Sequence, residues 1–336
     1  IPLDDPKVIK MFSETAVLGI DKKELMSDIA SFAIPEFNTN FTRQMLSDIK
    51  PNTFAELVKV SGLSHGTNVY LSNSQDLIKG STSYGKIEVK DIIGCRDDIM
   101  VQLISFGLEK SKAFEIMEFV RRGNPSKKPN EWLNYESEMR LSGVPDWYIW
   151  SCQKIKYMFP KSHATAYVMM ALRIAWFKIH HPLLFYSAYF SKRAEKFDYE
   201  RMLAGPQAIK NKIKSLQMEP RLTQKDENVL TTMLVAYEFV LRGFKFKKVH
   251  ISKSDSSVFL MEDNSLRMPF TSIDGLGLSV ANDILEKRKE KPFETKDEIK
   301  SRTKINQTIF ELLNSYGAFD ELKDKKTISN QGLFAL

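Results

Sequence analysis

Apolar residues recur along most of the chain at intervals of three and four, the spacing that places side chains on one face of an α-helix. Prolines and glycine-containing turns separate these runs, and strand-like alternation is rare before residue 244. We expect helices over 6–15, 21–31, 41–50, 54–61, 74–79, 97–106, 135–141, 145–157, from Ser162 to just before Pro182, 208–216 and 227–241. The pattern predicts a mainly α fold.

The longest of these helices has a distinctive start. Ser162 is a typical N-cap residue and Pro160 restrains the chain before it, so Lys161 and His163 bracket a helix N-terminus. Free backbone N–H groups and the helix dipole favour an anion there, and a lysine and a histidine add a charge and a donor. The start therefore indicates a phosphate site. The alternative is that Ser162 only caps the helix and His163 is a surface residue.

The pattern changes after Gly243. Residues 244–251 alternate apolar and polar, and the apolar runs 258–261 and 266–269 flank a polar turn. Alternation with period two is typical of half-buried strands. We expect a small antiparallel sheet here.

Residues 273–281 match a helix-hairpin-helix element. Gly275 would make the tight turn, and Gly277 would leave backbone N–H groups bare at the start of a helix, where a DNA phosphate can approach closely. Such contacts position duplex DNA without reading its sequence. A second helix pair over 295–316 resembles a partner hairpin. The alternative is a glycine turn in a small helical domain.

Composition places few limits on function. The 336 residues suffice for two or three domains, and 43% hydrophobic with 27% charged residues is ordinary for a soluble protein. The net charge of +7 suits a polyanionic partner but does not establish one. Cys95 and Cys152 form no C-x-x-C pair, so the sequence indicates neither a disulfide framework nor a zinc site, and we expect both to be buried thiols.

No apolar run reaches membrane-spanning length and no signal peptide opens the chain, so we expect a cytoplasmic location without membrane contact. The first residue is Ile1, which favours a fragment or a processed chain.

Two further positions carry candidate chemistry. His65 lies in a glycine-flanked stretch, 62–67, that is either a ligand-facing loop or a plain helix connection. Arg96 precedes the acids Asp97 and Asp98 at a predicted helix start. It could bind a phosphate in bidentate fashion or form an internal salt bridge.

Two other features have no assigned role. Residues 121–132 are rich in Gly, Pro and Lys and indicate a flexible basic surface segment. The aromatic residues that follow could stack on nucleic acid bases, although helical spacing favours a place in the core. They are Trp147, Tyr148, Trp150 and Tyr157.

The chain resembles the PolC type of the bacterial DNA polymerase III alpha subunit over nearly its whole length. The blocks that carry the resemblance are Ile1-Pro2-Leu3-Asp4-Asp5-Pro6, Gly62-Leu63-Ser64-His65-Gly66-Thr67, Ile93-Gly94-Cys95-Arg96-Asp97-Asp98-Ile99-Met100, residues 154–164 (KIKYMFPKSHA), His180-His181-Pro182-Leu183-Leu184 and Gly275-Leu276-Gly277. The resemblance implies a multi-helix fingers domain over 1–196 and a helical connector with a small antiparallel sheet over 197–269. It further implies a tandem helix-hairpin-helix domain over 270–322 and a tail with a clamp-binding peptide over 323–336.

The resemblance also implies site residues. It assigns incoming dNTP to Lys161, Ser162, His163, Arg96, Tyr167 and His65. It assigns duplex DNA to Gly275, Gly277, Ser279, Lys287, Arg288, Arg302 and Lys304, and the sliding clamp (beta subunit) to Gln331, Leu333, Phe334 and Leu336.

Catalytic carboxylates are not evident in the sequence. Nucleotidyl transfer needs two metal ions held by clustered carboxylates, and no Asp-x-Asp pair occurs. The resemblance implies that these groups, with Mg²⁺, lie in a palm domain outside this chain, which would bind no cofactor alone. We therefore expect a part of a replicative DNA polymerase, inactive by itself, whose partners are template-primer DNA, dNTP, the clamp and other replisome subunits. The alternative is a non-catalytic duplex-binding module.

Overall fold

The computed structural model describes residues 1–324, which contain eighteen α-helices and three short strands. The predicted mainly α fold is confirmed. The chain divides into two compact units, Ile1–His180 and His181–Leu336. The finer domain boundaries expected at 196, 269 and 322 stay predictions. Within the described residues, no helix has both the length and the apolar character that a membrane span requires.

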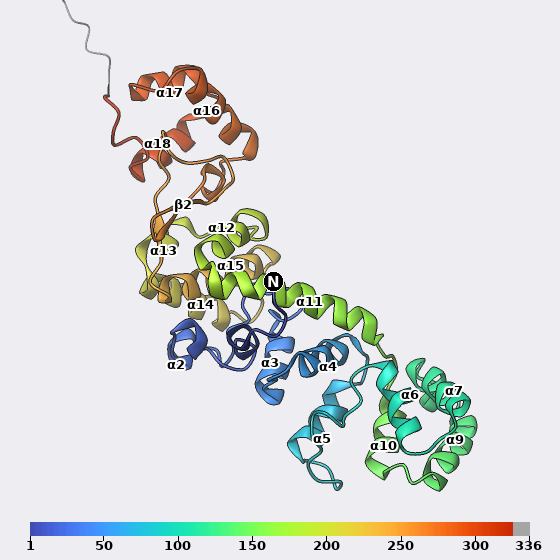
Figure 1. Ribbon diagram of the computed structural model, residues 1–336. Helices are drawn as coiled ribbons and strands as arrows, with labels where there is room; N and C mark the ends of the chain where they lie inside the picture. Colours follow the sequence, from blue (N-terminus) through green and yellow to red (C-terminus); the bar gives the residue numbers. More distant parts are fainter. Residues whose placement is uncertain (325–336) are drawn as a thin grey trace, which may run out of the picture. The chain divides into compact units, whose positions relative to one another are not determined.

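The regular elements of unit 1 are all helices, apart from one isolated bridge between Thr67 and Tyr157. Figure 1 shows α6, α7, α9 and α10 gathered at one end of this unit, with α11 leading away from them. Its helices are α1 (Pro6–Lys10), α2 (Lys22–Leu25), α3 (Asn40–Ile49), α4 (Phe54–His65), α5 (Gln75–Lys79), α6 (Arg96–Ser105), α7 (Lys110–Arg121), α8 (Asn124–Lys127), α9 (Pro129–Leu141), α10 (Asp146–Lys154) and α11 (Lys161–His180).

α11 organises unit 1, because it packs against α4, α1 and α6. Its buried face is a stripe of mostly small side chains: Ala164, Val168, Ala171, Leu172 and Ala175. Small residues let the neighbouring helices approach closely. Two larger apolar residues of the helix lie off this face, since Tyr167 is 36% exposed and Met170 is 41% exposed.

Two predicted helices and one predicted turn differ from the structure. The expected helix over 21–31 is reduced to α2, because Met26 adopts the left-handed conformation at φ 58° and ends it. The expected turn over 62–67 is wrong at its start, since α4 continues through His65. The helix predicted over 6–15 ends at Lys10.

The prediction that residues 121–132 form a flexible segment is wrong as well. It forms α8 and the first turn of α9, and it buries Pro125 and Trp132. Gly123 has φ +70°, and its backbone lies so close to the backbone of Lys156 that an added Cβ would be 2.5 Å from the Lys156 carbonyl oxygen. The glycine here serves close packing rather than flexibility.

Unit 2 combines a helical layer with a small sheet and a terminal group of three helices, α16 to α18 in Figure 1. Its elements are α12 (Pro182–Lys192), α13 (Tyr199–Ala204), α14 (Pro206–Met218), α15 (Gln224–Leu241), β1 (Lys245–Lys247), β2 (Leu260–Glu262), β3 (Ser265–Arg267), a 3₁₀ turn (Phe270–Ser272), α16 (Leu278–Glu290), α17 (Lys296–Arg302) and α18 (Gln307–Ser315).

The sheet is mixed, so the prediction of an antiparallel sheet is wrong for one of its two pairings. β2 and β3 form an antiparallel hairpin, whereas β1 pairs with β3 in parallel, in the order β1-β3-β2. The long connection after β1 brings the chain back across the sheet before β2, which a parallel pairing requires. Phe246 of β1 meets Phe239 of α15 and Phe190 of α12, with ring centroids 4.6 and 5.4 Å away.

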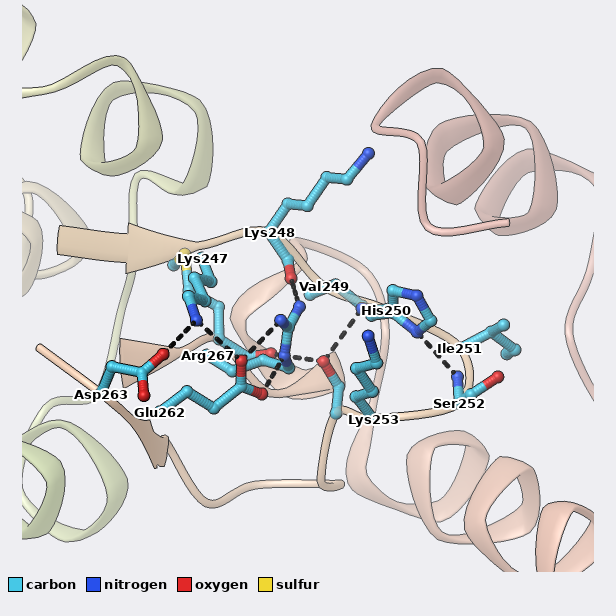
Figure 2. A network of polar contacts seen from close by, with 12 residues as sticks. Lys247, Lys248, Val249, His250, Ile251, Ser252, Lys253, Glu262, Asp263 and Arg267 are labelled. Atoms are coloured by element: carbon cyan, nitrogen blue, oxygen red, sulfur yellow. Dashed lines mark hydrogen bonds and ion pairs between the residues drawn. The ribbon is translucent and has the colours of Figure 1, made fainter. Parts of the chain in front are cut away.

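Figure 2 shows the polar network around Arg267 of β3. Arg267, almost fully buried, donates to the carboxylate of Glu262 and, through Nη1, to the Lys248 carbonyl oxygen at 2.8 Å. Lys247 Nζ lies 3.2 Å from Glu262 Oε2 and 3.7 Å from Asp263 Oδ2. A buried guanidinium is stable only when its donors are used, and here two partners use them.

Candidate functional site

The N-terminus of α11 is capped from outside the helix. α11 begins at Lys161, so Ser162 lies inside the first turn and the prediction that it is the N-cap is wrong. The backbone N–H of Lys161 instead donates to Asp97 Oδ2 at 2.8 Å. A carboxylate from α6 therefore occupies part of the anion-binding position that the sequence predicted. The N–H groups of Ser162 and His163 belong to the same first turn, where a helix supplies no acceptor.

α6 begins beside this turn, since the N–H of Arg96 donates to the Phe159 carbonyl oxygen at 3.1 Å. The carboxylate of Asp98 is buried and accepts from the N–H groups of Gly94 and Cys95, both at 3.1 Å. These bonds close a capping box. Asp98 is thereby fixed at the point where α6 and α11 meet.

Cations surround the two carboxylates. Lys161 Nζ lies 3.1 Å from Asp98 Oδ1, Lys59 Nζ lies 3.8 Å from Asp98 Oδ2, and Arg96 Nε lies 3.8 Å from Asp97 Oδ2. The Asp98 charge raises the pKa of Lys161, while burial lowers the pKa of Lys59. Three cations thus lie within 4 Å of the two carboxylates, and the charge of Asp91 also acts on Lys59.

An aromatic group adjoins the cations. His65, from the last turn of α4, stacks on Phe159 with centroids 4.5 Å apart, and Phe159 stacks on Tyr167 at 6.0 Å. His163 meets Phe159 edge-on at 5.9 Å. His65 Nδ1 lies 2.8 Å from the Ser61 carbonyl oxygen, and its Nε2 lies 3.0 Å from Glu36 Oε2. These contacts fix the orientation of the His65 ring.

The structure thus brings together all six residues expected at the nucleotide site: Arg96, Lys161, Ser162, His163, Tyr167 and His65. Sequence reasoning missed Lys59, Phe159 and the capping role of Asp97. Phe159 stands beside Pro160 in the block that carries the resemblance, a signal that could have identified it. Lys59 has no sequence signal, because only the fold brings α4 next to α6.

The glycine hairpin of unit 2 has the predicted geometry. Gly275 adopts φ +86°, and Gly277 is the N-cap of α16 without a side-chain hydrogen bond. A Cβ added at Gly277 would meet no atom within 4 Å. Gly277 and Ser279 are exposed, so the first turn of α16 presents bare N–H groups to solvent.

The hairpin also borders a pocket of about 290 Å³ that Lys196, Lys225 and residues 271–277 help to line. Lys225 Nζ lies 3.2 Å from Asp274 Oδ2. Glu195 and Asp274 line the same pocket, so two carboxylates match the two lysines beside the glycines.

The four basic residues predicted to bind DNA divide into two kinds. Arg288 donates to the carbonyl oxygens of Ile251 and Ser254 at 2.8 and 2.9 Å, and Arg302 donates to those of Lys287 and Lys291 at 2.6 and 2.7 Å. Both guanidinium groups are thus engaged within the domain.

The two lysines are more accessible. Lys304 is 73% exposed and lies 3.9 Å from Asp283 Oδ1, and Lys287 pairs with Glu290 at 2.8 Å. Lysine pairs of this kind at a surface are weak and are readily exchanged for another anion.

The clamp-binding residues Gln331, Leu333, Phe334 and Leu336 lie outside the described residues. Both cysteines are buried and free, as expected. Within residues 1–324, no group of three or more His, Cys, Asp or Glu side chains is arranged to hold a metal ion.

Comparison with known proteins gives the family. Residues 1–143 match the bacterial DNA polymerase III alpha subunit finger domain, and residues 243–328 match a helix-hairpin-helix motif. PolC-type DNA polymerase III chains from Oceanobacillus iheyensis and Bacillus subtilis are each 47% identical over 330 residues, which is 98% of this chain and 22% of theirs. The Thermotoga maritima protein of the same name is 47% identical over 324 residues, 96% of this chain and 23% of that one.

The chain spans about a fifth of the length of these relatives. It therefore belongs to the PolC-type DNA polymerase III family over one segment, which carries a finger domain and a helix-hairpin-helix motif.

Proposed function

We propose that this chain supplies the incoming-nucleotide and duplex-DNA binding surfaces of a replicative DNA polymerase. The observation that carries the proposal is the convergence of Arg96, Lys161 and an aromatic stack at the N-terminus of α11. A triphosphate would place its oxygens on the first-turn N–H groups and on the two cations, and charge-assisted hydrogen bonds would hold it there.

The carboxylates at this position are part of the proposal. Asp97 caps α11 and Asp98 holds Lys161, so the cations are already oriented before an anion arrives. Binding a triphosphate requires the Lys161 Nζ to exchange Asp98 for a phosphate oxygen. Since Asp98 keeps its two backbone N–H donors, it remains satisfied after the exchange.

The hairpin of unit 2 would hold duplex DNA. The open space at Gly277 and the bare N–H groups of α16 match the close approach that a phosphate needs. Contacts of this kind touch the DNA backbone, so the binding would be independent of sequence and sensitive to salt.

We further propose that the metal-binding carboxylates for nucleotidyl transfer are supplied by the parts of the relatives that this chain does not match. The chain alone would then show no primer extension. We also propose that residues 331–336 bind the sliding clamp and so attach the polymerase to it.

The test combines this chain with a separately produced palm-containing portion of a PolC-type relative in a primer-extension assay. We expect activity only in the mixture. Activity from the chain alone would contradict the proposal for the carboxylates, and duplex binding without activity in the mixture would favour a non-catalytic DNA-binding module.

Lys161→Ala in the active mixture should raise the KM for dNTP about tenfold or more, because a charged hydrogen bond to phosphate is lost. The matched control is Lys110→Ala, which removes an exposed lysine from the first position of another helix, α7. Equal KM values for the two variants would exclude Lys161 from the triphosphate site.

A further inference from the structure

A second basic pocket lies in unit 1, formed by two sequence features that the proposed function does not use. Gly123 brings the start of the segment 121–132 against Lys156, and α10, just before that residue, carries three members of the aromatic cluster, Trp147, Tyr148 and Trp150. The segment and the end of α10 together line a pocket of about 330 Å³. Its lining residues are Asn68, Leu71, Ser72, Ser126, Gln153, Lys154 and Lys156.

The chemistry of this lining selects an anion. Six of the seven side chains carry a hydroxyl, amide or ammonium donor, and none is a carboxylate. Lys156 is exposed, and no carboxylate of the described residues forms an ion pair with it or with Lys154. The pocket therefore holds positive charge that the fold itself does not neutralise.

Lys154 is held in place beside an aromatic ring. Its Nζ donates to the Ser72 carbonyl oxygen and lies 3.8 Å from the centroid of Trp150. Tyr84 meets the same indole edge-on at 5.8 Å. Trp150 is only partly buried, so an ordered cation and an aromatic surface adjoin one another.

The loop that forms the other wall is held by a buried side chain. Asn68 and Ser72 both adopt φ 56°, a left-handed conformation that costs free energy for residues other than glycine. The fully buried Asn73 fixes the loop, because its Nδ2 donates to the carbonyl oxygens of Asn68 and Ser151 and its Oδ1 accepts from Ser151 Oγ. Leu71 of this loop is 56% exposed at the pocket, so its apolar side chain does not contribute to the core.

We propose that this pocket binds single-stranded DNA, with a backbone phosphate on Lys154 and Lys156 and a base or sugar against Leu71, while Trp150 holds Lys154 from behind. Cations interleaved with aromatic and apolar surface are the combination by which proteins bind single strands without sequence preference. That the ligand is DNA rests on the proposed function. The partner would be the unpaired template strand, which is distinct from the duplex proposed to bind unit 2.

The test measures the affinity of the whole chain for a fluorescein-labelled oligothymidylate of about 15 nucleotides by anisotropy over a range of salt concentrations. Lys156→Glu should weaken binding about fivefold or more. Lys156→Ala should reduce the slope of log affinity against log salt by about 0.7, the value for one phosphate contact of a single strand. Both substitutions lie at an exposed side chain, so the fold is retained.

Lys110→Ala and Lys110→Glu are the matched controls, since they make the same charge changes at an exposed lysine outside the pocket. If the Lys110 and Lys156 variants behave alike, the pocket proposal is wrong. Competition by free dTTP as strong as by the oligonucleotide would assign the pocket to a nucleotide instead of a strand.

Duplex binding separates the two proposals. If Lys156→Ala leaves single-strand affinity unchanged while the chain still binds duplex DNA through α16, only the pocket proposal fails. If the chain binds neither form of DNA, the proposed function fails with it.

Discussion

The carboxylate of Glu262 is held ionised by its neighbours in the sheet network of Figure 2. Its hydrogen bonds with Arg267 and then with Lys247 lower its pKa from 4.5 to about 2, against the opposing effect of burial. A carboxyl group with a lowered folded-state pKa stabilises the fold above its unfolded pKa, and this contribution is lost as the pH falls through the folded value.

Glu262→Gln should therefore lower the free energy of unfolding at pH 7 by about 2 kcal/mol. The difference from the parent chain should shrink between pH 4.5 and about 2, where the parent carboxyl itself becomes protonated. Urea denaturation at several pH values measures both effects. Glu286→Gln, at an exposed position of α16, is the control and should change neither. A stability difference independent of pH would mean that Glu262 acts by packing rather than by charge.

The sequence offered two hypotheses for Arg96 at the start of α6. Arg96 could pair with a phosphate or with the acids that follow it, and in the structure its Nε is 3.8 Å from Asp97. This separation leaves room for the guanidinium to accept a closer anion, because an exposed pair of this length contributes little. The two hypotheses are therefore compatible, with Asp97 as the internal partner.

At the scale of elements, the proposed duplex site offers a reason for the glycine at the N-cap position of α16. Ser, Thr, Asp and Asn stabilise an N-cap more than Gly does, yet α16 has Gly277 there while α15, α17 and α18 have capping side chains. The helix gives up a capping hydrogen bond and keeps its N–H groups accessible.

Gly277→Asp should change stability and DNA binding in opposite directions. The new carboxylate would have open space, would cap α16 and would interact favourably with the helix dipole. The free energy of unfolding should therefore rise by about 0.5 kcal/mol. The same charge should weaken duplex affinity about tenfold or more, because it repels phosphate. Thermal denaturation and anisotropy with a labelled duplex measure the two effects.

Thr53→Asp is the matched control, since it adds a carboxylate at the N-cap of α4. It should leave duplex affinity unchanged. If Gly277→Asp binds duplex as well as the parent chain does, the hairpin is not the duplex site.

At the scale of the whole molecule, the proposed nucleotide and duplex sites belong to different compact units, 1–180 and 181–336. Each site is built from its own elements. The positive net charge of +7 is shared by the chain as a whole and would promote encounter with DNA without specifying where it binds.

The double variant Lys161→Ala with Gly277→Asp should therefore show two independent defects. Its KM for dNTP, measured in the reconstituted mixture at saturating primed template, should match that of Lys161→Ala. Its duplex affinity should match that of Gly277→Asp, because substitutions without shared partners act additively. A KM in the double variant several-fold above that of Lys161→Ala would show that the two sites are coupled.

The sequence by itself determined the mainly α class, the position of α11 and the glycine hairpin, because helical spacing, proline stops and the conformational freedom of glycine act locally. The sequence also identified the six candidate residues that lie together at the N-terminus of α11 in the structure. Local signals could not show that Asp97 rather than Ser162 caps this helix, since the cap comes from an element 64 residues away.

Only the tertiary structure decided the parallel pairing of β1, the inward positions of Arg288 and Arg302, and the ordered packing of 121–132. Each depends on which distant backbone groups come within reach. Arg302 meets the last carbonyl groups of α16, and Gly123 meets the backbone of Lys156. Contacts between segments far apart in the chain are selected by burial and shape across the whole fold, so no pattern of neighbouring residues records them.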